Sequence, residues 1–302
     1  LMPKHLILIS GPTAVGKTKL SLLIAEKYKT DIISCDSRQF YKEMTIGTAV
    51  PSINDLARVK HHFIQNLSIV NNYSIGQFER DALEKIETLH NEKNSIVMVG
   101  GSGMYIEAVF KGLDDFPSVP ETIHQELNRC FKNEGIESLK DQLLKLDPEY
   151  AKTVDQSNPH RIIRALGVSI SAKQPYSSFR KQQAKKRNFK TIKIILDRDR
   201  DELYHRINKR VDNMMSEGLL DEVKKLYKYR DYNALQTVGY NELFAYFDGE
   251  WNLETAIEEI KKNTRRYAKR QLTWFRRDPQ NVFFNPEEPS EILEYIQTHL
   301  TT

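Results

Sequence analysis

The glycine-rich segment at residues 11–18 constrains the fold of this chain more than any other feature. The pattern G-x-x-x-x-G-K-[ST] is matched by Gly11, Pro12, Thr13, Ala14, Val15, Gly16, Lys17 and Thr18. In such a segment the glycines let backbone N–H groups close around a di- or triphosphate, the lysine supplies a positive charge, and the final hydroxyl can hold Mg²⁺. An apolar run at 5–10, which we expect to be a buried strand, precedes the segment, and helical periodicity at 17–28 follows it. This context predicts a phosphate-binding loop that joins a strand to a helix, whose N-terminus adds positive potential.

The rest of the chain alternates strand-like and helical segments. Further strand-like runs lie at 31–35, 95–99 and 191–196, and helical patterns lie at 74–90, 200–217, 219–229, 240–247 and 253–275. The alternation predicts an α/β fold with a P-loop NTPase-like parallel sheet wound by right-handed crossovers. After the run at 191–196 we expect only helices.

The length of 302 residues is long for a single domain. No strand-like run occurs between 112 and 190, where two helical patterns lie at 121–146 and 158–172. We therefore expect a core of residues 1–114 and 191–302, which includes the C-terminal helices, interrupted by a helical insertion domain at 115–190.

The positive charge of the chain is concentrated in two segments. Residues 180–190 hold six Lys or Arg side chains and residues 261–277 hold eight, with no acidic residue in either segment. These 14 are part of a total of 45, so the other 274 residues carry 31 basic side chains against all 41 acidic ones. A mildly acidic body with two cationic segments favours a polyanionic partner, although either segment alone could be a solvated surface.

The composition argues against a membrane or secreted protein. The mean hydropathy is −0.57, and no apolar run approaches the ~18 residues that a membrane helix needs. There is no pattern of a cleaved signal peptide, and the two cysteines, Cys35 and Cys130, cannot form a disulfide framework. We expect a cytoplasmic protein, and a monomer.

Two polar residues follow strands at the edge of the sheet that carries the loop. Asp36 comes directly after the run at 31–35, where open α/β sheets bind their ligands. From this position it could order a metal ion, cap a following helix or act as a general base, and the three alternatives stay open. Ser102, in the Gly-rich turn after the run at 95–99, offers a hydroxyl to the same edge. The pair His61-His62 has no carboxylate or cysteine at metal spacing, so no metal site is expected there.

The helical pattern at 253–275 has two sides. Ile257, Ile260, Ala268 and Phe275 repeat at helical spacing and are expected to pack on the core, while the cations lie on the other sides with Tyr267 and Trp274 between them. Cations for phosphates and aromatic rings for bases are typical of an RNA contact.

Several segments, taken in order along the chain, resemble the bacterial tRNA dimethylallyltransferases, also called tRNA isopentenyltransferases. The matching stretches are GPTAVGKT at 11–18, DSRQFY at 36–41, MTIGTAVP at 44–51, GGSGMY at 100–105, HRIIRAL at 160–166, QTVGYNE at 236–242 and TRRYAKRQLTWFR at 264–276. The phosphate loop is shared with many proteins, but the ordered combination is specific to this family. Lys60 and Gln65 stand where relatives often carry Pro and Asp, and Ser102 stands where most carry Thr.

The resemblance implies an enzyme that moves a dimethylallyl group from its diphosphate to N6 of the adenosine 3′-adjacent to the tRNA anticodon, releasing diphosphate. Residues 11–18 would bind the diphosphate, with Mg²⁺ on Thr18. The catalytic residues would be Asp36, as acceptor of a hydrogen bond or proton from N6, together with Ser102 and Arg210, which helps to clamp the diphosphate.

The family's tRNA-contacting segments carry over to matching positions, and the helical insertion would grip the anticodon stem. These positions are Asp36, Ser37, Arg38, Gln39, His160, Arg161, Ile162, Ile163, Arg164, Gln236, Gly239, Tyr240, Lys269, Arg270, Gln271, Trp274 and Arg276.

Two other classes of protein share part of this pattern. A kinase of a nucleoside or small metabolite would have the same loop and sheet but no need of the basic segments. A non-catalytic RNA-binding protein switched by a nucleotide would need no carboxylate such as Asp36 at the mouth of the site.

Overall fold

A computed structural model describes residues 3–181 and 183–301 of the chain. The chain forms two compact units, a larger one that runs up to Phe110 and resumes at Lys186, and a smaller one at Lys111–Lys185. The chain thus passes between the units twice. Both observed boundaries lie four or five residues before those expected from the sequence.

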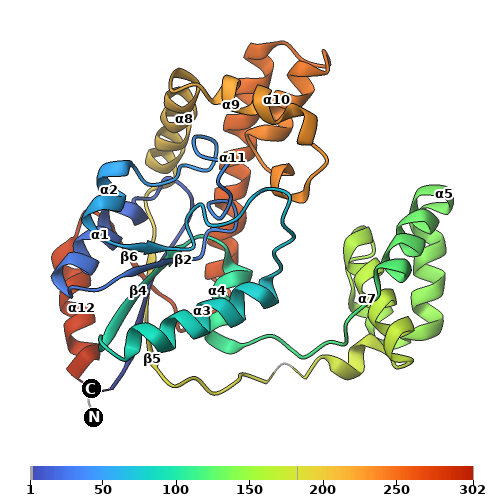
Figure 1. The fold of residues 1–302 in the computed structure, drawn as a ribbon, viewed down its shortest axis with the longest axis horizontal. Coiled ribbons are helices and arrows are strands. Elements are labelled where there is room, and N and C mark those ends of the chain that lie inside the picture. The colour runs from blue at the N-terminus through green and yellow to red at the C-terminus, as the bar shows by residue number, and fades with distance from the viewer. Residues whose placement is uncertain (1–2, 182, 302) are drawn as a thin grey trace. The chain divides into compact units, whose positions relative to one another are not determined.

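The larger unit is built on a six-stranded parallel sheet with the strand order β3-β2-β4-β1-β5-β6 (Figure 1). The strands are β1 (His5–Ser10), β2 (Ile32–Ser34), β3 (His61–His62), β4 (Ser95–Gly100), β5 (Lys190–Leu196) and β6 (Val282–Phe284). β1 lies in the middle of the sheet, between β4 and β5, and the chain adds strands on both sides of it. The glycine-rich loop, which follows β1, therefore leaves the middle of the sheet at its carboxyl edge. That edge is where open α/β sheets bind ligands.

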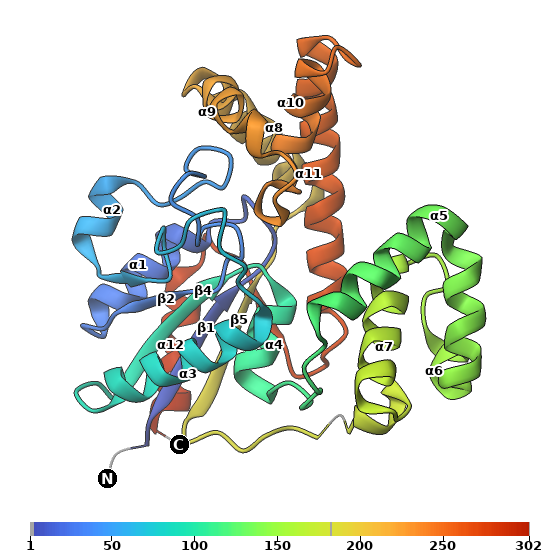
Figure 2. The ribbon, with the colours of Figure 1, turned by 45° about the vertical axis from the view of Figure 1, so that its right-hand side comes forward.

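Helices cover both faces of the sheet. The helices of the larger unit are α1 (Lys17–Lys27), α2 (Ile53–Arg58), α3 (Ile75–His90), α4 (Gly103–Lys111), α8 (Arg200–Ser216), α9 (Leu219–Leu226), α10 (Tyr240–Phe247), α11 (Leu253–Phe275) and α12 (Pro289–Thr301), with short 3₁₀ turns η2 (Tyr227–Tyr229) and η3 (Asn233–Leu235). Helices α3 and α4 lie on one face of the sheet and α1 and α12 on the other (Figure 2). Along β1 the buried side chains alternate between two cores: Leu6 and Leu8 pack towards α3 and α4, whereas Ile7 and Ile9 pack towards α1 and α12. This alternation follows from the two-residue period of a strand.

The expectation that only helices follow the fourth strand is wrong. Val282–Phe284 forms β6, which pairs in parallel with β5 at the edge of the sheet. Three residues are too short to show a period, and so are the two residues of β3. The pattern expected to be one helix at 219–229 is instead α9 followed by the 3₁₀ turn η2.

The smaller unit consists of helices alone within its described residues. They are α5 (Glu121–Leu146), α6 (Pro148–Thr153), α7 (Pro159–Ala172) and the 3₁₀ turn η1 (Tyr176–Phe179). Gly135 has non-helical backbone angles and divides α5 into two helices. Leu139, Leu143, Ile162 and Leu166 pack at the centre of its own core.

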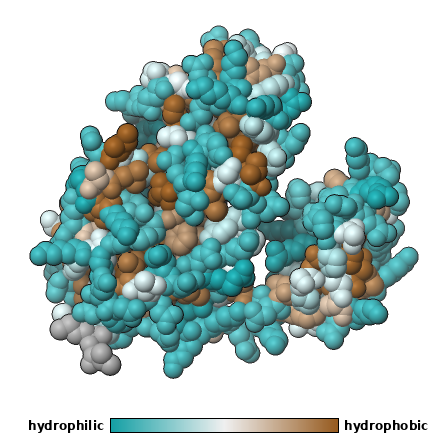
Figure 3. Space-filling view, viewed as in Figure 1, coloured by the Kyte–Doolittle hydropathy of each residue, from teal (hydrophilic) through white to brown (hydrophobic). Residues whose placement is uncertain are grey.

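Hydrophilic side chains dominate the surface seen in Figure 3, with smaller groups of apolar ones between them. In the two described stretches, 3–181 and 183–301, no helix is both long and apolar enough to cross a membrane.

Candidate active site

The loop at 11–16 takes a backbone course that its sequence makes possible. Gly11 has φ +142°, and a Cβ at this position would lie 2.5 Å from the carbonyl oxygen of Leu196 on β5. Gly16 caps α1 with φ +117°. Both conformations favour glycine, so the two glycines of the motif determine how the loop turns from β1 into α1.

Arginines from α8 and the segment before it hold the loop from outside. Arg198 donates from Nε to the carbonyl of Val15 at 2.8 Å, and Arg206 donates from Nε to the carbonyl of Ala14 at 2.9 Å. Arg210 donates from Nη1 to Thr13 Oγ1 at 3.3 Å. Arg198 also pairs with Glu202 and Glu287, so the positive charge added to the loop comes from Arg206 and Arg210. Together with the N-terminus of helix α1 it favours an anion.

Lys17 lies over the loop that it belongs to. Its ammonium group donates to the carbonyls of Pro12 at 2.7 Å and Gly11 at 3.0 Å. Burial, and to a smaller extent Arg210, lower the pKa of Lys17 to about 8, while Asp36 acts in the opposite direction. The side chain is still mainly protonated at neutral pH, and a bound phosphate would favour the charged form further.

A small cavity beside Lys17 has a donor set that suits Mg²⁺. About 40 Å³ in volume, it is lined by the Thr18 hydroxyl and the Asp36 carboxylate, among others. Mg²⁺ prefers oxygen ligands and is typically held by one or two protein groups plus phosphates and waters. Among the residues that the structure describes, no group of three or more His, Cys, Asp or Glu could hold a metal ion by itself. The residues present thus fit Mg²⁺ that is shared with a phosphate chain.

Asp36 stands at the carboxyl edge of the sheet, one residue beyond Cys35. Its Oδ1 accepts the backbone N–H of Arg38 at 3.1 Å, which closes a turn. One of the three alternatives for Asp36, capping a following helix, is wrong, because the chain continues in turns and α2 begins only at Ile53. Ser102 accepts the backbone N–H of Ser37 at 3.2 Å, so the turn after β4 supports the turn that carries Asp36.

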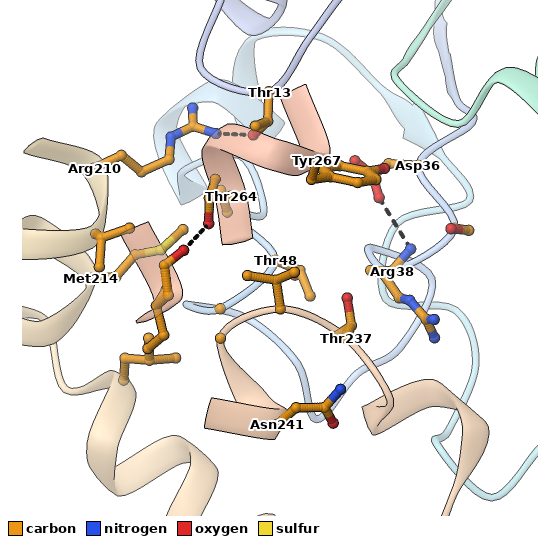
Figure 4. Close-up of a pocket in the computed structure, with 18 of the residues that line it drawn as sticks. Thr13, Asp36, Arg38, Thr48, Arg210, Met214, Thr237, Asn241, Thr264 and Tyr267 are labelled. Atoms are coloured by element: carbon orange, nitrogen blue, oxygen red, sulfur yellow. Dashed lines mark hydrogen bonds between the residues drawn. The ribbon is translucent and has the colours of Figure 1, made fainter. Parts of the chain in front are cut away.

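Tyr267 on α11 is a site residue that no sequence motif marks as catalytic. Its ring lies beside the Asp36 carboxylate, as Figure 4 shows. Desolvation of the phenol and, next, the charge of Asp36 raise the pKa of Tyr267 to about 12, although the side chain as a whole is 37% exposed. The phenol therefore stays neutral at physiological pH.

A larger cavity of about 440 Å³ opens next to Asp36 (Figure 4). Thr13, Asp36 and Arg210 form its polar end. Its apolar lining comes from α8, α9, α11, the loop before α10 and the loop before α2, and consists of Val211, Met214, Leu219, Val238, Ile260 and Ala49. Further polar side chains line the cavity as well, among them Thr48, Thr237, Asn241 and Thr264 (Figure 4). A ligand with an anionic end and a short apolar end matches this polarity.

Glu222 of α9 fixes one wall of this cavity. Its carboxylate accepts the backbone N–H groups of Thr45 (3.1 Å), Ile46 (2.8 Å) and Gly47 (3.0 Å), and the hydroxyl of Tyr240 at 2.7 Å. Burial and then Glu222 raise the pKa of Tyr240. Tyr240 is fully buried, and its ring packs against Gly47, where a Cβ would lie 2.6 Å from it. Its expected contact with tRNA stays a prediction.

Gln271 is also buried, and its expected contact with tRNA stays a prediction. Its Oε1 accepts the backbone N–H of Thr13 at 2.9 Å, and its Nε2 donates to the carbonyl of Gly101 at 2.9 Å. With 7% of its surface exposed and both ends of the amide used, Gln271 connects the phosphate loop to the turn that holds Ser102.

Three other residues that were expected to contact tRNA, Arg38, Gln39 and Gln236, donate hydrogen bonds to backbone carbonyls of the loops around the cavity. The guanidinium of Arg38 donates to the carbonyls of Asn233, Ala234 and Gln236. Gln39 donates to the carbonyls of Thr48 and Ala49. The exposed Gln236 side chain donates to the carbonyl of Arg230 at 2.7 Å, while Gly239, buried with φ +96°, precedes α10.

The exposed side of α11 keeps its positive charge. Lys269, Arg270 and Arg276 are exposed, although Arg276 pairs with Asp197 at 2.9 Å. Trp274 is partly buried and packs on Gly103, where a Cβ would lie 2.3 Å from its indole nitrogen.

Helix α7 of the smaller unit carries five residues that were expected to contact tRNA, three of them exposed and two buried. His160, Arg161 and Arg164 are exposed. Ile162 and Ile163 are 0% and 4% exposed and belong to the core of that unit, and their expected contact with tRNA stays a prediction. The two are buried because the helical period turns two of five consecutive residues inward.

The fold and this site together define a P-loop protein whose phosphate loop opens into a cavity with an apolar wall. Comparison with known proteins narrows the class. The family model described as IPP transferase matches residues 39–278, and the chain belongs to this family.

The relatives and solved structures that are similar to this chain carry the names of tRNA dimethylallyltransferases or tRNA isopentenylpyrophosphate transferases. A tRNA dimethylallyltransferase of Christiangramia forsetii is 54% identical over 302 residues, which cover the whole of both chains. The crystal structure of a full-length tRNA isopentenylpyrophosphate transferase from Bacillus halodurans has a TM-score of 0.72 and 37% identity, covering 99% of this chain and 97% of that one. A eukaryotic dimethylallyltransferase crystallised acting on tRNA has a TM-score of 0.77 and 28% identity, covering 90% of this chain and 70% of that one.

Proposed function

We propose that this protein is a tRNA dimethylallyltransferase that moves a dimethylallyl group from dimethylallyl diphosphate to N6 of the adenosine 3′-adjacent to the anticodon. The names of its relatives support a transferase that acts on tRNA. The observation that carries the proposal is the cavity in which the phosphate loop meets an apolar wall, with Asp36 at the junction. A kinase of a small metabolite would place a polar acceptor there and would not need the apolar wall.

The loop would bind the diphosphate end of the donor. Backbone N–H groups, Lys17 and Arg210 are the donors that surround this position. When the C–O bond to the diphosphate breaks, the leaving group takes the bonding electrons, and these groups stabilise the charge that develops on it. Mg²⁺ bound through Thr18 would neutralise part of the same charge.

The apolar wall would hold the five-carbon group, and Asp36 would act on the nucleophile. The new bond forms between N6 and the carbon that loses the diphosphate, and N6 gives up one proton. An exocyclic amine is a weak nucleophile, so a carboxylate that accepts this hydrogen bond or proton assists the attack. The adenosine must leave its stack to enter the cavity. Ser102, through its hydrogen bond to the N–H of Ser37, would hold the turn that carries Asp36.

The exposed cations of α11 would contact the tRNA backbone, and those of α7 in the smaller unit would add further phosphate contacts. Because tRNA is its proposed substrate, we place the protein in the cytoplasm. We expect it to act as a monomer, which light scattering of the free protein would test.

The reaction is tested with dimethylallyl diphosphate, Mg²⁺ and tRNA that lacks the modification. After digestion to nucleosides, mass spectrometry should find adenosine carrying one added dimethylallyl group. A protein that gives no such product but transfers phosphate from ATP to a small metabolite would be a kinase. A protein that binds RNA according to its bound nucleotide, with neither product, would be a nucleotide-switched binding protein.

A further inference from the structure

Arg187 lies in the basic segment at 180–190, but it is not a surface cation. Its guanidinium donates from Nη2 to Glu79 Oε1 at 2.7 Å and to the carbonyl of Ala108 at 2.8 Å, and from Nε to the carbonyl of Val109 at 2.8 Å. The side chains of Arg187 and Glu79 are 12% and 11% exposed. A guanidinium so enclosed contacts protein groups rather than phosphates.

The partners of Arg187 lie where the chain leaves and re-enters the larger unit. Ala108 and Val109 are in the last turn of α4, just before the chain passes to the smaller unit after Phe110. Arg187 is the second residue after the chain returns at Lys186. The last carbonyls of a helix lack partners within the helix and attract a cation. Arg187 therefore fastens the returning segment to the helix by which the chain departs.

The same two segments are joined again at their ends in the smaller unit. The backbone N–H of Lys185 donates to the carbonyl of Lys111 at 2.7 Å, and the Lys185 ammonium pairs with Asp115 at 2.8 Å. Gly112 has φ +83°, and a Cβ there would lie 2.8 Å from the Lys185 side chain. Each unit thus holds its own ends of the two connections together.

We propose that Arg187 is a positioning residue that, with Glu79, joins the two connections between the units into one paired strap. Two independent tethers would let the helical insertion take many orientations, whereas a paired strap restricts them. The consequence for catalysis rests on the proposed function, because a substrate that contacts both units binds only those conformers that suit it. The apparent affinity falls with the fraction of such conformers.

The restriction itself is measured without any substrate. Spin labels are placed on the exposed residues Glu254 of α11 and Lys145 of α5, as Glu254→Cys and Lys145→Cys in a Cys130→Ser background. Double electron–electron resonance gives the distribution of distances between the units. Arg187→Ala should broaden this distribution. The matched control, Lys186→Ala, removes the same charge from the exposed neighbouring residue and should leave the distribution unchanged.

Kinetics then separate positioning from a simple effect of charge. If loosening the strap reduces the competent fraction to about a tenth, Arg187→Ala raises KM for tRNA about tenfold. KM for dimethylallyl diphosphate, which would bind within the larger unit, should stay within about twofold of the wild-type value, since the variant changes no residue that contacts this substrate. A charge effect on RNA binding would appear at least as strongly in Lys186→Ala.

An unchanged distance distribution in Arg187→Ala, or an equal effect of Lys186→Ala, overturns the proposal. If Arg187→Ala does not fold, Gly112→Ala is tested by the same criteria, because it disturbs the pairing from the smaller unit without changing charge. The distances report on the strap even if the protein proves to catalyse another reaction, so the two proposals fail separately.

Discussion

Replacing Gln271 by Ala tests whether this residue supports the phosphate loop or contacts tRNA. The change removes two hydrogen bonds of 2.9 Å and leaves the N–H of Thr13 and the carbonyl of Gly101 without those partners. An orphaned buried polar group costs about 1–3 kcal/mol, so the free energy of unfolding of the larger unit should fall by about 3 kcal/mol. For a unit of this size the loss corresponds to a decrease in Tm of roughly 6–10 °C.

The binding of substrates gives the second half of this prediction. Thr13 lies in the phosphate loop, so Gln271→Ala should weaken the binding of dimethylallyl diphosphate about tenfold, equivalent to ~1.4 kcal/mol. Scanning calorimetry measures Tm, and titration calorimetry measures the Kd of the diphosphate and of tRNA separately. Lys269→Ala, an exposed residue on the same helix, is the control and should change neither Tm nor the affinity for the diphosphate. A variant with normal Tm and normal diphosphate binding, but weaker tRNA binding, would refute the supporting role.

Three further predictions concern charges around the site. The pKa of Lys17 is lowered from 10.5 to about 8, so above pH 8 the unfolded chain keeps a proton that the folded protein loses, and stability rises with pH. Relative to Lys17→Met, the wild type should therefore gain about 2 kcal/mol between pH 7.5 and pH 10 in urea unfolding, whereas a constant difference contradicts the low pKa. Glu222→Gln removes the negative charge that accepts three hydrogen bonds from the loop at 45–47, so the free energy of unfolding should fall by about 2 kcal/mol. KM for dimethylallyl diphosphate should rise. An unaltered KM would mean that this loop does not contribute to the dimethylallyl diphosphate site. Neutralising both Lys269 and Arg270 should reduce the slope of log Kd for tRNA against log salt by roughly 1.5, and an unchanged slope would mean that these side chains touch no phosphate.

The parts of the fold that were predictable are those written locally in the sequence. The phosphate loop needs two glycines with positive φ at fixed spacing, and β1 and α1 flank it with clear apolar patterns. The position of Asp36 followed from a rule of topology, since the carboxyl ends of parallel strands meet at one edge. The short strand β6 was missed because three residues carry no period.

The parts of the site that escaped prediction depend on contacts between distant segments. Gln271 reaches Thr13 across 258 positions of sequence, and Arg198 reaches Val15 across 183. No local pattern indicates such a contact. Motif matching also does not tell a buried residue from an exposed one, so it did not indicate that the side chains of Tyr240, Gln271 and Ile162 are buried. For Ile162 the apolar period of α7 was a usable signal.

The most direct test of the mechanism is the rate of a single turnover in Asp36→Asn. Asn keeps the shape of the side chain and can still accept the N–H of Arg38, but it does not take a proton from N6. With enzyme in excess and Mg²⁺ present, quench-flow measurement of dimethylallyl transfer to tRNA should give a rate at least about 100-fold below that of the wild type. The Kd for tRNA should stay within about twofold. A single-turnover rate equal to that of the wild type would contradict the assignment of Asp36 to the reacting amine.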